Sequence, residues 1–174
     1  RDRVQQELIA KVNPENKQGS FADAVKGADV LIGCSAPGVF NVEAIKTMND
    51  KSIVFAMANP VPEIMYEEAK EKGVYIYGSG RSDMPNQVNN SSVFPGLFRG
   101  ALDVRARQIN EEMKLAAAHA LADLAIHSGK LDPDHVVVDV FDPQVPFAVA
   151  KAVAKAAIAS GVARATELPE KYRD

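Results

Sequence analysis

The chain contains little of what several classes of protein require. Among its 174 residues tryptophan is absent, and aromatic residues make up only 6%. The side-chain charges sum to −3, and no block of basic residues occurs. Nucleic-acid-binding domains usually combine a basic surface with aromatic side chains on which bases stack. We therefore expect no nucleic acid partner.

Cysteine and long apolar segments are also scarce. Cys34 is the single cysteine, so the chain cannot form an internal disulfide, which is typical of proteins in the reducing cytosol. No apolar run approaches the ~20 residues of a membrane-spanning helix, and no signal peptide is recognisable. These features predict a cytoplasmic protein with no membrane partner. Because the first residue is Arg1 rather than methionine, we expect the chain to be a piece of a longer protein.

The first half of the sequence alternates short apolar runs with helical segments. Residues 29–34, 53–58 and 74–77 are apolar and contain β-branched side chains, which predicts three buried strands. The helices predicted around these strands cover residues 20–27, 41–48 and 62–73, the last with Pro62 as its first residue. Such alternation is typical of a parallel sheet with helices on both faces.

Beyond residue 90 the pattern becomes helical. The predicted helices cover residues 91–107, 110–126 and 147–160, the second beginning at the capping residue Asn110. The predicted fold class is therefore α/β, a Rossmann-like doubly wound parallel sheet followed by a helical C-terminal section.

Polar and small residues follow all three predicted strands. Ser35 and Ala36 follow the first strand, Asn59 follows the second, and an amide-rich loop from Gly80 to Asn90 follows the third. The carboxyl ends of parallel strands meet at one edge of the sheet, where α/β folds bind ligands. Because amides both donate and accept hydrogen bonds without charge, this edge suits a small ligand with carboxylate, hydroxyl or carboxamide groups.

Several of these residues also have a purely structural interpretation. Asn, Asp, Pro and Gly form ordinary turns, although capping one helix needs only one of Asn89 and Asn90. Arg81 and Asp83 could pair with each other or with a ligand. Cys34 suits a small buried residue better than a nucleophile.

Two kinds of binding motif are incomplete or absent. The three histidines recur at intervals of eight residues, ~12 Å along a helix, too far apart for one metal ion, so we interpret them as surface or capping residues. Gly78 and Gly80 match the start of the dinucleotide fingerprint G-x-G-x-x-G, but Asp83 stands at its third glycine. Either the fold binds no nucleotide, or its phosphate loop precedes Arg1.

The sequence resembles the malic enzymes along nearly its whole length. The matching segments, in order, are residues 27–33, 35–38, 55–63, 80–83, 89–90, 94–96, 99–106, 141–143 and 160–164, read as GADVLIG, SAPG, FAMANPVPE, GRSD, NN, FPG, RGALDVRA, FDP and SGVAR. The last two segments are similar to the short bacterial form of the family.

The resemblance implies a function and a set of site residues. The family oxidises and decarboxylates malate to pyruvate with NAD or NADP and a Mg²⁺ or Mn²⁺ ion. With the resemblance we also expect a homo-oligomer, namely a homodimer. By resemblance, Ser35, Ala36 and Pro37 line the dinucleotide. Asn59 and Asn89 contact both the cofactor and the substrate, and Asn90 contacts the substrate.

The resemblance also implies what this chain lacks. The family's Gly-rich loop, its catalytic Tyr and Lys and its carboxylate metal ligands all precede the segments that match here. Residues 1–174 would then be the distal part of an NAD(P)-binding domain plus C-terminal helices, with no catalytic or metal-binding residue, and inactive alone. Two alternatives stay open: another Rossmann-type dehydrogenase, such as an amino-acid or shikimate-like oxidoreductase, or a non-catalytic ligand-binding or dimerisation module.

Overall fold

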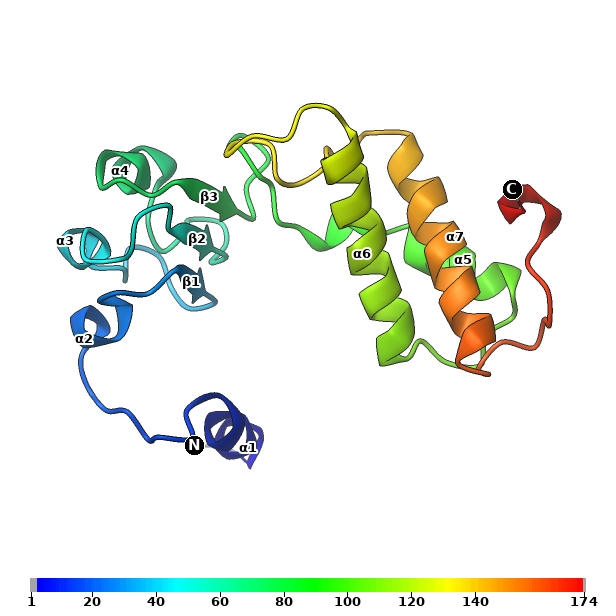
Figure 1. The fold of residues 1–174 in the computed structure, drawn as a ribbon, viewed down its shortest axis with the longest axis horizontal. Helices are drawn as coiled ribbons and strands as arrows, with labels where there is room; N and C mark the ends of the chain where they lie inside the picture. The colour runs from blue at the N-terminus through cyan, green and yellow to red at the C-terminus, as the bar shows by residue number, and fades with distance from the viewer. Residues whose placement is uncertain (1–2, 174) are drawn as a thin grey trace.

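The computed structural model of the chain describes residues 3–173, which form a sheet lobe and a helical lobe (Figure 1). In chain order the elements are α1 (Arg3–Val12), α2 (Phe21–Val25), β1 (Val30–Gly33), α3 (Val42–Ile45), β2 (Ile53–Ala56), α4 (Tyr66–Glu71), β3 (Ile76–Ser79), the 3₁₀ turn η1 (Asn90–Ser92), α5 (Gly96–Asp103), α6 (Glu111–His127), α7 (Gln144–Ala159) and the 3₁₀ turn η2 (Glu170–Tyr172). Within this part of the chain, none of the helices combines the length and the apolarity that a membrane crossing needs.

The sheet is parallel, with strand order β1-β2-β3. Ile53 at the start of β2 pairs with Val30 of β1 and with Ile76 of β3. The first residues of the three strands are therefore aligned side by side in the sheet. This register places the third strand two residues later than the predicted range 74–77. Together with the helical section that follows, the parallel sheet confirms the predicted fold class.

The two faces of the sheet differ in burial. Val54, Ala56 and Tyr77 are 0% exposed and belong to a core that includes residues of α3 and α4, with Phe21 of α2 packed against it. Side chains alternate between the faces of a strand, and on the other face of β1 Val30 is 49% and Ile32 63% exposed. The prediction that residues 29–34 form a buried strand is therefore wrong for this face. Within residues 3–173, helices α2, α3 and α4 contribute to the core on the opposite face.

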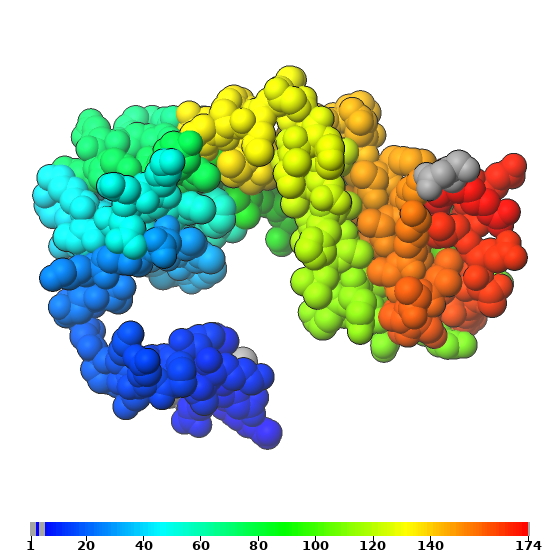
Figure 2. All heavy atoms as spheres, in the orientation of Figure 1, coloured from blue at the N-terminus to red at the C-terminus, as the bar shows by residue number. Residues whose placement is uncertain are grey.

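The helical lobe is built around α7, which packs against both α5 and α6. Its core includes Val104, Met113, Val149 and Val153, each 0% exposed. Gly100 allows α5 to approach α7, because a Cβ at this position would lie 2.4 Å from the carbonyl oxygen of Ala150. The two lobes meet through the segment around residues 128–141, and a hollow separates them on the other side (Figure 2).

The predicted helices differ from the structure in their bounds. Helices α2 and α3 are shorter than the predicted 20–27 and 41–48. The helix predicted from Pro62 begins only at Tyr66, because the carbonyl groups of Pro62 and Glu63 accept hydrogen bonds from Gly38 and Phe40 instead of from a following helical turn. The predicted helix 91–107 is interrupted before α5, where Pro95 has no N–H to donate. Helix α7 begins at residue 144 rather than 147, with a proline in its first turn, where proline is tolerated.

We expect Gly100→Ala to destabilise the protein. The added methyl group would meet the backbone of Ala150 at 2.4 Å and the Cβ of Val153 at 2.9 Å, and a backbone contact cannot relax by a change of rotamer. Overpacking of this kind costs about 1–3 kcal/mol, measured as a lower midpoint of thermal unfolding. Gly80→Ala is the matched control, because its nearest atom, the carbonyl oxygen of Val88, lies at 4.0 Å. Equal unfolding midpoints for the two variants would contradict this packing argument.

Candidate functional site

The predicted ligand-facing residues lie in loops that follow the three strands. All of them are exposed: Ser35, Ala36, Pro37, Asn59, Asn89 and Asn90. The arrows of β1, β2 and β3 point toward the helical lobe, so the carboxyl edge of the sheet faces the hollow between the lobes (Figures 1 and 2). This arrangement brings the predicted residues to one side of the molecule.

Glu63 joins the loop after β1 to the loop after β2, although the sequence analysis assigns it no role beyond a helix. Its Oε1 accepts hydrogen bonds from the backbone N–H of Ser35 at 2.8 Å and from the Ser35 hydroxyl at 3.1 Å. Its Oε2 accepts one from the backbone N–H of Ala58 at 2.9 Å. Because Glu63 is 0% exposed, one buried carboxylate connects the two loops directly beside Asn59.

Hydrogen-bond donors keep Glu63 ionised. Burial by itself raises the pKa of the Glu63 carboxyl, but the N–H groups of Ala58 and Ser35 and the Ser35 hydroxyl stabilise the charged form, so its pKa lies below the ordinary value. Gly33 leaves the space for this carboxylate, since a Cβ there would lie 2.7 Å from it. The sequence does contain a signal for this contact. Glu63 follows closely on the prolines after β2, and the neighbouring strand β1 ends in Gly33, which has no side chain to fill the space.

Arg81 and Asp83 pair with each other. The Arg81 Nε donates to Asp83 Oδ1 at 2.8 Å, and the Arg81 Nη2 donates to Asp83 Oδ2 at 2.5 Å. The pair holds the pKa of Asp83 below its usual range. Arg81 also donates to the carbonyl oxygen of Pro60 at 3.2 Å, so this side chain links the loop after β3 to the loop after β2. Of the two possibilities that the sequence left open, the structure shows the internal pair.

The amide side chains divide into structural and available ones. Asn89 caps η1: its Oδ1 accepts from the backbone N–H of Ser91 at 2.9 Å, and its Nδ2 donates to the carbonyl oxygen of Gly80 at 3.5 Å. No hydrogen bond to the side chain of Asn59 or Asn90 occurs within residues 3–173. Asn59 and Asn90 are therefore the exposed amides that are free to bind a ligand, and no hydrogen bond joins them to each other.

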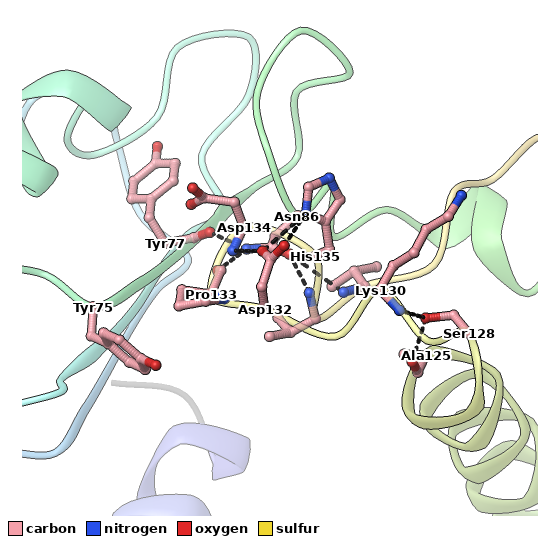
Figure 3. A network of polar contacts seen from close by, with 12 residues as sticks. Tyr75, Tyr77, Asn86, Ala125, Ser128, Lys130, Asp132, Pro133, Asp134 and His135 are labelled. Atoms are coloured by element: carbon pink, nitrogen blue, oxygen red, sulfur yellow. Dashed lines mark hydrogen bonds and ion pairs between the residues drawn. The ribbon is translucent and has the colours of Figure 1, made fainter.

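Asn86 holds the amide-rich loop against the segment that links α6 to α7 (Figure 3). Its Nδ2 donates to the carbonyl oxygens of Tyr77 and Pro133, both at 2.8 Å. Its Oδ1 accepts from the backbone N–H groups of Val136 at 2.7 Å and Val137 at 3.4 Å. Asn86 is 5% exposed and has a φ of 53°, which Asn tolerates better than most residues.

Asn86→Ala should therefore be strongly destabilising. The substitution leaves the buried carbonyl of Tyr77 and the half-buried backbone groups of Pro133 and Val136 without these partners, and an unpaired buried group costs about 1–3 kcal/mol. We expect a loss of about 3 kcal/mol or more in the free energy of unfolding, measured by denaturant titration. Asn16→Ala is the control, because Asn16 has a similar φ of 49° but is exposed. A loss no larger than that of the control would show that the backbone conformation, rather than the hydrogen bonds, matters at Asn86.

The histidine, cysteine and acidic side chains of residues 3–173 form no metal site. Among residues 3–173, no group of three or more His, Cys, Asp or Glu side chains could hold a metal ion. His119, His127 and His135 are exposed, as the sequence predicts. Cys34 is also exposed, so the expectation that it is a buried residue is wrong: it lies just past the end of β1, where the chain turns into the surface loop.

Comparisons with known proteins match most of this chain to one family of domains. The family profile "Malic enzyme, NAD binding domain" matches residues 4–158. The chain is 52% identical over 171 residues to a bifunctional malic/malolactic enzyme of Bacillus subtilis (strain 168), covering 98% of this chain and 42% of that protein. It is 51% identical to an NAD-dependent malic enzyme of Geobacillus stearothermophilus, covering 94% of this chain and 34% of that protein.

A solved structure agrees with these sequence matches. The crystal structure of an Entamoeba histolytica malic enzyme superposes with a TM-score of 0.88 at 45% sequence identity, covering 99% of this chain and 38% of that one. The chain thus spans between 34% and 42% of the length of these relatives.

Proposed function

This chain belongs to the malic enzyme family, and on that premise we propose that residues 1–174 are the distal part of an NAD(P)-binding domain in an enzyme that oxidises and decarboxylates malate to pyruvate. The observation that carries the proposal is the pair of exposed amides, Asn59 and Asn90, whose side chains have no hydrogen bond within residues 3–173. Asn59 lies in the loop that follows β2, and Asn90 lies at the start of η1, which follows β3.

The donor set of this edge fits a dinucleotide and a small dicarboxylate. Ser35, Ala36 and Pro37 would line the dinucleotide with small, exposed side chains. Asn59 and Asn89 would contact the carboxamide of the nicotinamide ring and the substrate, and Asn90 would contact the substrate. Because Asn89 also caps η1 and donates to Gly80, it would contact the ligand through the second N–H of its Nδ2. Amides can donate to carboxylate oxygens and both donate to and accept from a carboxamide.

The proposed contribution of these residues is orientation. When bound, NAD or NADP supplies the acceptor for the hydride that leaves C2 of malate. Asn90 donates to a malate carboxylate, while Asn59 holds the carboxamide, so that the carbon that loses the hydride and the ring that receives it are kept at a fixed distance. Fixing two reactants in this way removes much of the entropic barrier to their reaction.

The other components of the proposed enzyme lie outside this chain. We place the Gly-rich phosphate loop, the acid–base residues and the ligands of a Mg²⁺ or Mn²⁺ ion there. A hard divalent cation prefers several oxygen ligands, and Asp83, the acid of the amide-rich loop, is already paired with Arg81. We further propose a cytoplasmic homodimer, on the basis of the family resemblance and of the single cysteine.

In the complete enzyme, Asn90→Ala and Asn59→Ala should impair kinetics more than stability. Neither side chain has a hydrogen bond to lose within residues 3–173. For Asn90, a hydrogen bond to the charged malate carboxylate contributes about 1.5–3 kcal/mol, which corresponds to a loss in kcat/KM of about ten- to a hundredfold. Steady-state kinetics with malate and thermal unfolding measure the two effects.

Asn110→Ala is the opposite control. Asn110 caps α6 by accepting from the backbone N–H of Met113 at 3.1 Å, so its loss should cost about 1 kcal/mol of stability and leave kcat/KM unchanged. Unchanged kinetics in Asn90→Ala, or a loss of stability there as large as in Asn110→Ala, would contradict the proposed substrate contact.

The 174-residue chain alone should show no malate-dependent reduction of NAD or NADP, with or without Mn²⁺. It has no Gly-rich loop to bind pyrophosphate at a helix N-terminus, and residues 3–173 hold no cluster of acids for the metal. Isothermal titration with Mn²⁺ and with NAD, beside a coupled activity assay, measures both parts. Tight, stoichiometric Mn²⁺ binding or measurable turnover would show that this chain carries catalytic groups of its own.

A further inference from the structure

Glu63 has a chemical setting that differs from that of the other acids in the described part of the chain. Among residues 3–173, it is the only buried residue that bears a carboxylate. Its hydrogen-bond partners within residues 3–173 are neutral: two backbone N–H groups and one hydroxyl. Burying a charge without an opposite charge is costly unless hydrogen bonds compensate for it. A buried charge held in this way, next to two ligand-facing loops, suggests a role in setting their geometry.

The two loops donate to the two oxygens of a single rigid group, the Glu63 carboxylate. Oε1 is occupied by Ser35 and Oε2 by Ala58, so the planar carboxylate fixes the spacing between these two backbone positions. The neighbouring backbone adds two further hydrogen bonds, from Gly38 to the carbonyl of Pro62 and from Phe40 to the carbonyl of Glu63. The segment at residues 62–63 thereby holds the loop after β1 along its length.

We propose that Glu63 is a positioning residue, which sets the distance between the dinucleotide-binding loop at Ser35–Pro37 and the nicotinamide- and substrate-facing Asn59. The proposal rests on the proposed function of this edge. Glu63 touches no ligand itself; it acts through Ser35, which it binds, and through Ala58, which precedes Asn59. A carboxylate is required because both of its oxygens face donors, and an ionised carboxylate presents acceptors only.

Glu63→Gln in the complete enzyme tests this requirement. The glutamine amide keeps the size and places an NH₂ group against an N–H donor of Ser35 or Ala58, so one loop loses its attachment. We expect NADH binding, measured by fluorescence titration, to weaken by about tenfold or more, and kcat to fall at saturating malate and NAD. Glu68→Gln is the matched control: Glu68 is exposed and accepts only from the N–H of Met65, at 3.2 Å, so NADH affinity should stay within about twofold.

Two further variants separate positioning from a general loss of stability. Gly100→Ala lowers stability in the helical lobe and should leave NADH affinity unchanged. Ser35→Ala removes the hydroxyl that donates to Glu63, and with it any contact of that hydroxyl with the dinucleotide, but it leaves the backbone N–H bond to Glu63 in place. In the double variant with Glu63→Gln, it should add less than its effect in the wild-type enzyme. If Glu63→Gln does not fold, Glu63→Asp keeps the charge and both acceptors but draws them back by one methylene group, so it should also weaken NADH binding.

The outcomes distinguish this proposal from the proposed function. If the wild-type enzyme binds NADH but does not oxidise malate, the proposed function is wrong, and the NADH affinities still test Glu63. NADH affinity and kcat within about twofold of wild type in folded Glu63→Gln would overturn the positioning role. An equal loss of affinity in Gly100→Ala or in Glu68→Gln would also overturn it.

Discussion

The connection between the two lobes depends on the hydrogen bonds of one buried amide, Asn86. The side chain uses both of its donors and its carbonyl oxygen on backbone groups, with Tyr77 on one side and the segment at Pro133 and Val136 on the other. Because a polar group that loses its partner on burial is costly, Asn86 stabilises this contact between the lobes, together with Lys70 and Tyr66 of the α4 region, which contact Asp134 of the same segment at 3.1 and 3.4 Å. The third strand and the segment between α6 and α7 are thus fixed together, and with them the hollow that the carboxyl edge of the sheet faces.

The chemistry of this edge follows from which charges are already satisfied. Arg81 is paired with Asp83, and the Glu63 carboxylate is enclosed by neutral donors. Among the residues that we assign to the ligand, those with functional polar side chains are a serine and three asparagines. Neutral amides orient a dicarboxylate but do not neutralise its charge, which is consistent with our placement of the metal and the cationic groups outside this chain.

The sequence predicted the parallel sheet, the helical section and the loops that carry the candidate site because these depend on local patterns. Apolar runs at regular spacing predicted the strands, and the capping residue Asn110 was placed correctly, since it accepts from the backbone N–H three residues later. The start of α4 was wrong because Pro62 and Glu63 take part in contacts with a loop about 25 residues earlier in the chain, which no local pattern indicates. Local pattern also could not show that Val30 and Ile32 are exposed in residues 3–173, because a strand's apolar side chains do not reveal which face is covered.

The sequence by itself determined the order of strands and helices from α2 onward, the family and the candidate residues in the loops after the strands, because periodicity, capping and motif are written in neighbouring positions. Helix α1 was not predicted. Only the tertiary structure decided what those residues do there. It assigned Asn89 to capping and left Asn59 and Asn90 free, and it paired Arg81 with Asp83. It also placed a buried carboxylate between two loops. The physical reason is that hydrogen bonds between distant segments depend on where the folded chain puts each donor and acceptor, and that placement is set by the strand register and by core packing.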